Sequence, residues 1–191
     1  MRIILINIIL FLTLISCSNR FKPPTYDNDY FEINNFKPKD TLFRVSKSEF
    51  YEMGDGFAFV NQKGDTIIPY GKFYHSFSDT IVTYGVIIEK KSYDLIGINQ
   101  NGERIYEIYK YDNGPDYISD GLFRILRDGK IGYADKTGKI IIEPQFECAS
   151  TFLNGIAEAT YDCYLYWDLD EHLRSESKSW FNIDKNGKRI K

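Results

Sequence analysis

Short apolar segments recur along the chain from about residue 41, and a polar turn follows each of them. Four copies of one turn pattern, with Asn or Asp first and Gly fourth, occupy residues 61–64, 99–102, 135–138 and 184–187. In such a turn the first side chain caps the loop, and Gly accepts the positive φ that lets the next strand pair back. The pattern therefore predicts four β-hairpins.

The segments beside these turns have the composition of antiparallel strands. Upstream segments occupy residues 57–60, 95–98, 131–134 and 180–183, and downstream segments occupy 66–68, 105–108 and 140–142. A further strand precedes each pair, as in residues 122–126, which Asp128-Gly129 follows as a two-residue hairpin signal. Each unit is predicted to be a three-stranded β-meander, so the fold class is all-β.

The units recur as tandem repeats. The turn glycines are 38, 36 and 49 residues apart. A three-stranded unit cannot bury both faces of its sheet, so neighbouring units must pack together, and about three or more are needed for stability. Because the units differ in length, we expect an open solenoid-like stack; the alternative is a closed, propeller-like arrangement.

The third copy carries the fullest set of repeat residues. It contains Ile131-Gly132, Asp135 with Gly138, Ile141-Ile142 before Pro144, and Phe152 with Gly155 and Ala157. This set resembles the WG-repeat family, which is marked by a Trp-Gly pair, a D-x-x-G turn, an apolar pair near a Pro, and F-x-x-G-x-A.

The resemblance extends over about residues 46–191, but the repeats are degenerate. The positions aligned with Trp-Gly hold Phe57-Ala58, Leu95-Ile96, Ile131-Gly132 and Trp180-Phe181. The resemblance implies an all-β repeat architecture of bacterial proteins, often lipoproteins or multidomain surface proteins. It supplies no catalytic residues.

The N-terminus has the layout of a secretory signal. An apolar run over residues 3–15 follows Arg2 and is too short to span a hydrocarbon core roughly 30 Å thick. It ends in Leu14-Ile15-Ser16-Cys17, which resembles the lipobox of bacterial lipoprotein precursors, where the cysteine receives lipid and becomes the first mature residue. The alternative is a plain signal peptide or an uncleaved anchor. We therefore expect a signal over residues 1–16, a lipidated Cys17 with a tether through residue 40, and a β domain over 41–191.

Charge and cysteine content limit the class of partner and the compartment in which the protein works. Without Arg2 the chain has 23 basic and 27 acidic side chains, a formal charge of 23 − 27 = −4, which argues against nucleic acid as a partner. Two cysteines remain after Cys17, namely Cys148 and Cys163. Outside the inner membrane they can form a disulfide, but two buried thiols are equally ordinary.

No constellation with recognisable catalytic or metal-binding spacing is found in the sequence. His75 and His172 lie in different repeats, and neither belongs to a known nucleophile signature. Asp168, Asp170, Glu171 and His172 offer cation ligands, but the Gly that bends a calcium loop is missing, so a solvated hairpin tip is favoured. We expect no cofactor, no metal and no enzymatic activity.

The fourth copy contains an insertion of about fifteen residues relative to the third, between its first two strands. Insertions in repeat proteins map to loops on one face, often the binding face. This one carries Tyr164, Tyr166 and Trp167, residue types favoured at recognition surfaces. Two interpretations stay open: these aromatics bind a partner, or they cap the end of the stack.

The sequence thus favours a lipid-anchored cell-envelope protein that is a non-catalytic binding module for a protein or glycan. Residues 18–22 carry no acidic group, unlike the export signals of some surface-displayed lipoproteins, so we expect it to face the periplasm. The membrane is contacted through the lipid on Cys17. One alternative is an envelope glycan or cell-wall hydrolase using Asp168 and Glu171 as an acid/base pair. Another is an immunity- or inhibitor-type lipoprotein.

Overall fold

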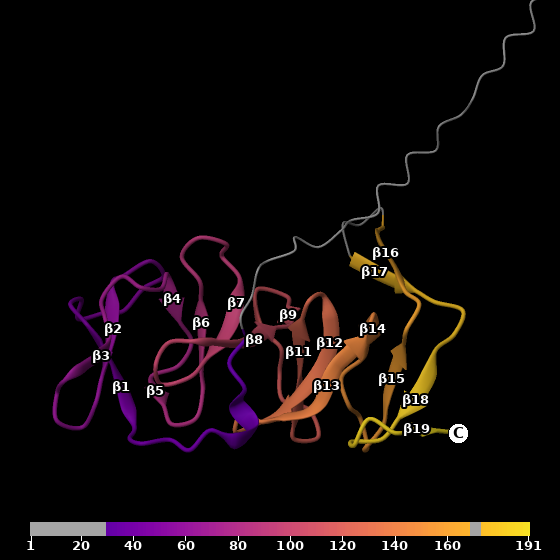
Figure 1. Cartoon of the computed structure of the whole chain (residues 1–191). Helices are drawn as coiled ribbons and strands as arrows, with labels where there is room; N and C mark the ends of the chain where they lie inside the picture. Colours follow the sequence, from indigo (N-terminus) through magenta and orange to yellow (C-terminus); the bar gives the residue numbers. More distant parts are fainter. Residues whose placement is uncertain (1–29, 169–172) are drawn as a thin grey trace, which may run out of the picture.

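Four three-stranded antiparallel meanders stand in a row in the computed structural model, which describes residues 30–168 and 173–191 (Figure 1). The lipobox and Cys17 lie outside the described residues. The first meander is β1 (Leu42–Ser46), β2 (Phe57–Val60) and β3 (Thr66–Ile68), and the second is β6 (Gly85–Ile88), β7 (Leu95–Ile98) and β8 (Arg104–Ile108). The third is β11 (Leu122–Arg127), β12 (Lys130–Asp135) and β13 (Ile140–Phe146), and the fourth is β15 (Ala157–Thr160), β18 (Phe181–Ile183) and β19 (Arg189–Ile190).

The predicted turn closes the second hairpin of every meander. In each copy the Asn or Asp Oδ1 accepts hydrogen bonds from the backbone N–H groups two and four residues further on, at 2.8–3.2 Å. The four turn glycines have φ between +72° and +87°, a region that L side chains rarely adopt. The prediction of four capped hairpins is confirmed.

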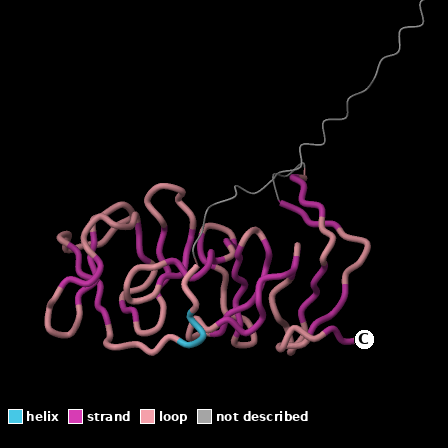
Figure 2. The backbone as a smooth tube through the Cα atoms, in the orientation of Figure 1, coloured by secondary structure: helices cyan, strands magenta, loops and turns pink. Residues whose placement is uncertain are grey.

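The sheets have open edges, as expected for a stack. The second and third meanders share one seven-stranded sheet because β8 pairs with β11, and this sheet ends at β13 and at β4 (His75–Ser76). The first meander continues only to β5 (Thr80–Ile81), and the fourth begins with β14 (Cys148–Ala149). Within the described residues the result is an all-β repeat fold without a closed barrel (Figure 2).

The hydrophobic core is divided among the interfaces between successive meanders. One cluster joins the first and second meanders, a second joins the second and third, and a third joins the third and fourth. In β7, Ile96 contributes to the first cluster and Leu95 to the second. Because side chains alternate along a strand, an inner meander buries both faces, which explains why β7 is apolar throughout.

Residues 30–40, which we call the strap, pack against the middle of the row, so the expectation of a tether through residue 40 needs correction. Ile33, in the short 3-10 helix η1 (Ile33–Asn35), is buried in the core between the second and third meanders. The Phe31 N–H donates to the Arg104 carbonyl at 2.7 Å, and Asn34 Oδ1 accepts from the Ile140 N–H at 3.0 Å. Folded structure therefore begins before Thr41.

The insertion forms a lengthened hairpin between β15 and β18, as predicted. Its strands are β16 (Tyr164–Trp167) and β17 (Leu173–Glu176), which we call the arm. Among the described residues the arm pairs with no other strand, and it projects from the row beside the fourth meander (Figure 1). Directly before it, Cys163 is joined to Cys148 of β14 by a disulfide, with the two Cα atoms 5.9 Å apart.

Candidate functional site

A cleft of about 690 Å³ lies between the third meander, β14 and the arm. The third-meander side is supplied by β11 and by Tyr109 and β9 (Lys110–Tyr111), which pairs with β10 (Gly114–Pro115). Leu165 and Ser175 line it from the arm, and Trp180 lines it from the segment before β18. The cleft is thus assembled from elements that are distant in sequence.

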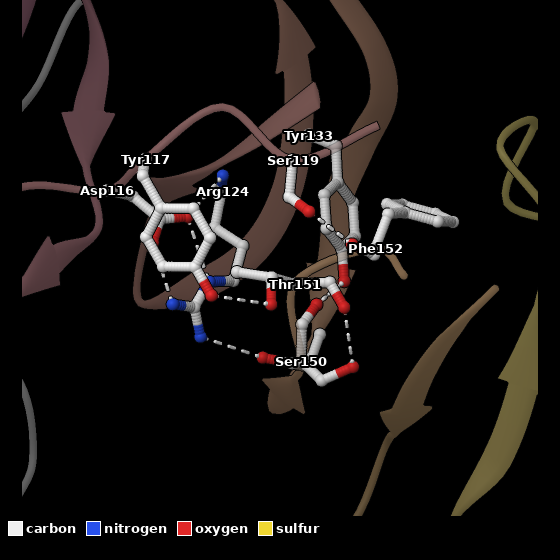
Figure 3. Close-up of polar contacts among 9 residues, drawn as sticks. Asp116, Tyr117, Ser119, Arg124, Tyr133, Ser150, Thr151 and Phe152 are labelled. Atoms are coloured by element: carbon white, nitrogen blue, oxygen red, sulfur yellow. Dashed lines mark hydrogen bonds and ion pairs between the residues drawn. The ribbon is translucent and has the colours of Figure 1, made fainter. Parts of the chain in front are cut away.

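A buried ion pair fixes one wall of this cleft. Arg124 of β11 donates from Nε and Nη2 to the two carboxylate oxygens of Asp116, at 3.0 and 2.8 Å (Figure 3). The Asp116 side chain is fully buried, and it also accepts the Arg124 backbone N–H at 2.9 Å. On its other side the guanidinium lies 3.8 Å from the centre of the Tyr109 ring. Burial alone lowers the pKa of Arg124, but the hydrogen bonds and charge of Asp116 outweigh it, so the pKa is raised and the group stays charged.

Side chains in and just before the third meander donate hydrogen bonds to backbone carbonyl groups in and after β14. Arg124 Nη1 donates to the Ala149 carbonyl at 3.2 Å, and the Tyr133 hydroxyl donates to the Ser150 carbonyl at 2.6 Å (Figure 3). Further on, Ser119 Oγ donates to the Phe152 carbonyl at 2.5 Å. Burial raises the pKa of Tyr133, so its hydroxyl remains a donor throughout the ordinary pH range. These bonds hold the third and fourth meanders in a fixed arrangement.

Two of the three predicted aromatic residues of the arm share one face. Tyr164 and Tyr166 stack with ring centroids 6.0 Å apart, and the Tyr166 hydroxyl donates to Glu176 Oε1 at 3.0 Å. Leu165, between them in sequence, is the residue of β16 that lines the cleft. The backbone of Trp167 pairs with Leu173, but its side chain lies outside the described part of the structure.

The sequence-based search missed most of the groups that form the cleft. Tyr109, Tyr111 and Trp180 supply rings to it, and Arg124 and Asp116 fix its wall. The only local signal was the run of three tyrosines at 106, 109 and 111, which resembles an ordinary core strand. The sequence left open whether Cys148 and Cys163 form a disulfide. They do, and the bond joins Cys148, which lines the cleft, to Cys163 directly before the arm.

Of the side chains considered for chemistry, Asp168 and His75 lie within the described residues, on the arm and beside the first meander. Asp168 is ion-paired with Arg174 at 2.7 Å on the arm, whereas Asp170, Glu171 and His172 lie outside the described residues. His75 stacks on Tyr51 at 5.1 Å beside the first meander, where burial and then the charge of Arg44 lower its pKa. Over residues 30–168 and 173–191 no group of three His, Cys, Asp or Glu could hold a metal. The same ranges contain no helix long and apolar enough to cross a membrane.

The third unit shows why its repeat residues are needed. A Cβ on Gly132 would overlap the Ile142 carbonyl oxygen and come within 2.6 Å of the Pro144 nitrogen, where β13 bulges against β12. Phe152 packs on Tyr133 with ring centroids 4.8 Å apart.

Residues 131–162 match the family model of the WG containing repeat. The WG repeat so defined spans β12, β13, β14 and β15, and therefore crosses from the third meander into the fourth. The WG repeat thus includes β14, whose two residues line the cleft. No curated protein and no solved structure matches the chain.

Proposed function

We propose that this chain is a lipid-anchored protein of the bacterial cell envelope whose repeat stack is a non-catalytic binding module for a protein or a glycan. The observation that carries the proposal is the cleft of about 690 Å³ beside the arm. Its volume lies in the range of ligand sites, and aromatic and charged side chains line it. An insertion that projects from a regular repeat scaffold is a usual place for recognition.

The anchoring part of the proposal rests on the sequence around Cys17. The run Leu14-Ile15-Ser16-Cys17 follows an apolar segment that is too short to span a bilayer. A lipidated Cys17 would hold the chain at the membrane, facing the periplasm. The Cys148–Cys163 disulfide is in keeping with an oxidising compartment.

The proposal that the module is non-catalytic rests on the ion pairs that the charged groups near the cleft form with one another. Arg124 and Asp116 are engaged with each other in a buried pair, and Asp168 is engaged with Arg174. A hydrolase would need two carboxyl groups about 5–10 Å apart, positioned around a scissile bond. Among the carboxylates that line this cleft, Glu147 is also engaged in an ion pair, with Lys130. Structural ion pairs of this kind serve to hold surfaces in place.

Crosslinking in intact cells tests the binding function. The full chain is compared with a variant in which residues 164–176 are replaced by Asn-Gly, which shortens the arm but keeps Cys163. A control variant, Phe50→Ala with Met53→Ala, removes exposed apolar side chains from the first meander. We expect one specific partner to be captured by the full chain and the control and lost with the short arm. Equal capture by all three would contradict the assignment of the cleft and arm.

Metabolic labelling tests the anchor independently. Cells grown with an alkyne-bearing fatty acid should label the full chain, and Cys17→Ser should abolish the label. Cys148→Ser with Cys163→Ser serves as the matched control, because it removes the other two thiols and should leave the label intact. Labelling of the Cys17→Ser chain would contradict the anchor.

A further inference from the structure

The cleft beside the arm offers flat aromatic rings together with hydrogen-bonding groups. Tyr111 is 55% exposed, and Trp180 lines the cleft from the segment before β18. Glu158 of β15 presents an exposed side chain at the same cleft, and so does Lys110 of β9. Ligands that fit such a lining have an apolar face and a polar rim. A pyranose ring has both, because its axial C–H groups form an apolar face and its hydroxyls point outward.

Half of the charged side chains that line the cleft already have a partner of opposite charge: Arg124 is paired with Asp116, Arg174 with Asp168, and Glu147 with Lys130. The other charged groups of the lining are Lys110, Asp112 and Glu158, a formal charge of 1 − 2 = −1. Such a cleft does not attract a phosphate or an acidic polymer, and it attracts a strongly basic peptide only weakly. An uncharged ligand is favoured.

On two walls of the cleft the backbone is already engaged, which counts against a peptide that adds there as a β-strand. Such a peptide binds chiefly through main-chain hydrogen bonds to an exposed strand edge. The Ala149 and Ser150 carbonyls of the edge accept from Arg124 and Tyr133. On the other wall, the N–H and carbonyl of Tyr109 bond to the Arg124 carbonyl and the Asp116 N–H. At these two walls recognition must therefore use side chains.

We propose that this cleft binds a short, uncharged oligosaccharide. Tyr111 and Trp180 supply the faces on which sugar rings pack, and Glu158 and Lys110 bind hydroxyl groups. The arm forms one side of the cleft through Leu165. This inference rests on the proposed binding function and narrows its ligand to one class.

Isothermal titration of the full chain tests the inference. The protein is held in a zwitterionic detergent that contains no sugar headgroup, and the probes are maltotetraose, cellotetraose and chitotetraose. Tetragalacturonate serves as the acidic comparison. We expect at least one neutral probe to bind, and to bind more tightly than tetragalacturonate.

Substitutions tie binding to the cleft. Tyr111→Ala should lower the affinity for the neutral probe by about tenfold or more, the loss typical of an aromatic anchor. Glu158→Ala, which removes an exposed carboxylate, should also weaken it. Tyr70→Ala, which removes a half-exposed tyrosine near the first meander, should leave affinity unchanged. Circular dichroism confirms that each variant is folded.

Three results would overturn the inference: no neutral probe binds, tetragalacturonate binds more tightly, or the folded Tyr111→Ala and Tyr70→Ala variants bind alike. Its failure is separable from that of the proposed function. If the crosslinked partner is a protein and depends on the arm, the binding module stands and the oligosaccharide does not. If crosslinking is also independent of the arm, both fail.

Discussion

The third and fourth meanders are built on the same plan and differ at one hairpin. In the third, Asp128 and Gly129 join β11 to β12 directly, both with positive φ. In the fourth, the arm occupies the same place between β15 and β18, yet the following turn at Asp184 keeps the hydrogen bonds of its counterpart at Asp135. One hairpin of the unit therefore tolerates a long insertion while its neighbour stays unchanged.

This difference shows what each part of the unit contributes. The Asp and Gly turn is specified by four adjacent residues, so it folds in the same way wherever it occurs. The hairpin that varies lies next to the cleft, and within the part of the chain that the structure describes no further strand pairs with the arm. An isolated two-stranded hairpin is marginally stable in water, so the disulfide before β16 supplies the support that packing does not.

The largest expected effect comes from comparing an ion pair in the third meander with one on the arm. Arg124→Ala leaves the buried Asp116 carboxylate unpaired and should lower the free energy of unfolding by about 3–5 kcal/mol. Arg174→Ala breaks the more exposed pair with Asp168 and should cost less than about 1 kcal/mol. Urea denaturation measures both. Similar losses would show that burial does not make the Arg124–Asp116 pair more important for stability than the exposed pair.

The disulfide is next in size. Cys148→Ala with Cys163→Ala releases a loop with a sequence separation of 15 and should destabilise the protein by about 3 kcal/mol in the chain-entropy model. Hydrogen exchange should accelerate more in β16 and β17 than in β11 and β12, because the bond lies directly before the arm and the arm has no neighbouring strand among the described residues. Unchanged exchange in the arm would mean that other contacts hold it.

At the position of Gly132 the two meanders differ in how large a side chain they can hold. Its counterpart in the fourth is Phe181, where β19 has no segment equivalent to Pro144. Gly132→Ala should therefore cost about 1–3 kcal/mol by overpacking against the backbone of β13. Gly114→Ala, where nothing lies within 4 Å of the added Cβ, should stay within about 0.5 kcal/mol of wild type. Thermal unfolding of the pair decides whether the clash is real.

The smallest effect should be the same in both meanders. Asp135→Ala and Asp184→Ala each remove the carboxylate that caps a turn, at a cost of about 1 kcal/mol. The two losses should agree within about 0.5 kcal/mol, since the turns share their hydrogen bonds. Asp→Asn at either site keeps the acceptor and should recover most of the loss. A much larger effect at one site, measured by urea denaturation, would show that the turns are not equivalent.

The fold was predictable where the information is local. The four turns, the meanders and the arm follow from residues close together in sequence, and the structure confirms them. The strap was missed because Asn34 bonds to Ile140, 106 residues away, and because Ile33 stands among Asn residues without strand periodicity. Local patterns carry no record of such distant contacts.

The candidate site was predictable only in part, for a related reason. The arm was identified from its length and its aromatic residues, but which of its faces meets the cleft depends on how β16 is oriented by the disulfide and by β15. Leu165 therefore lines the cleft although Tyr164 and Tyr166 attracted attention. Tyr111 and Trp180 come together from segments about seventy residues apart, and no short motif joins them.

The strap also sets an order of events during synthesis. Its partners, Gln100, Arg104 and Ile140, are made well after it, so the first of the described residues to leave the ribosome are among the last to dock. Until then, the core cluster that includes Ile33 lacks the residues that the third meander contributes to it. The strap can therefore make its full set of contacts only after the third meander has been synthesised.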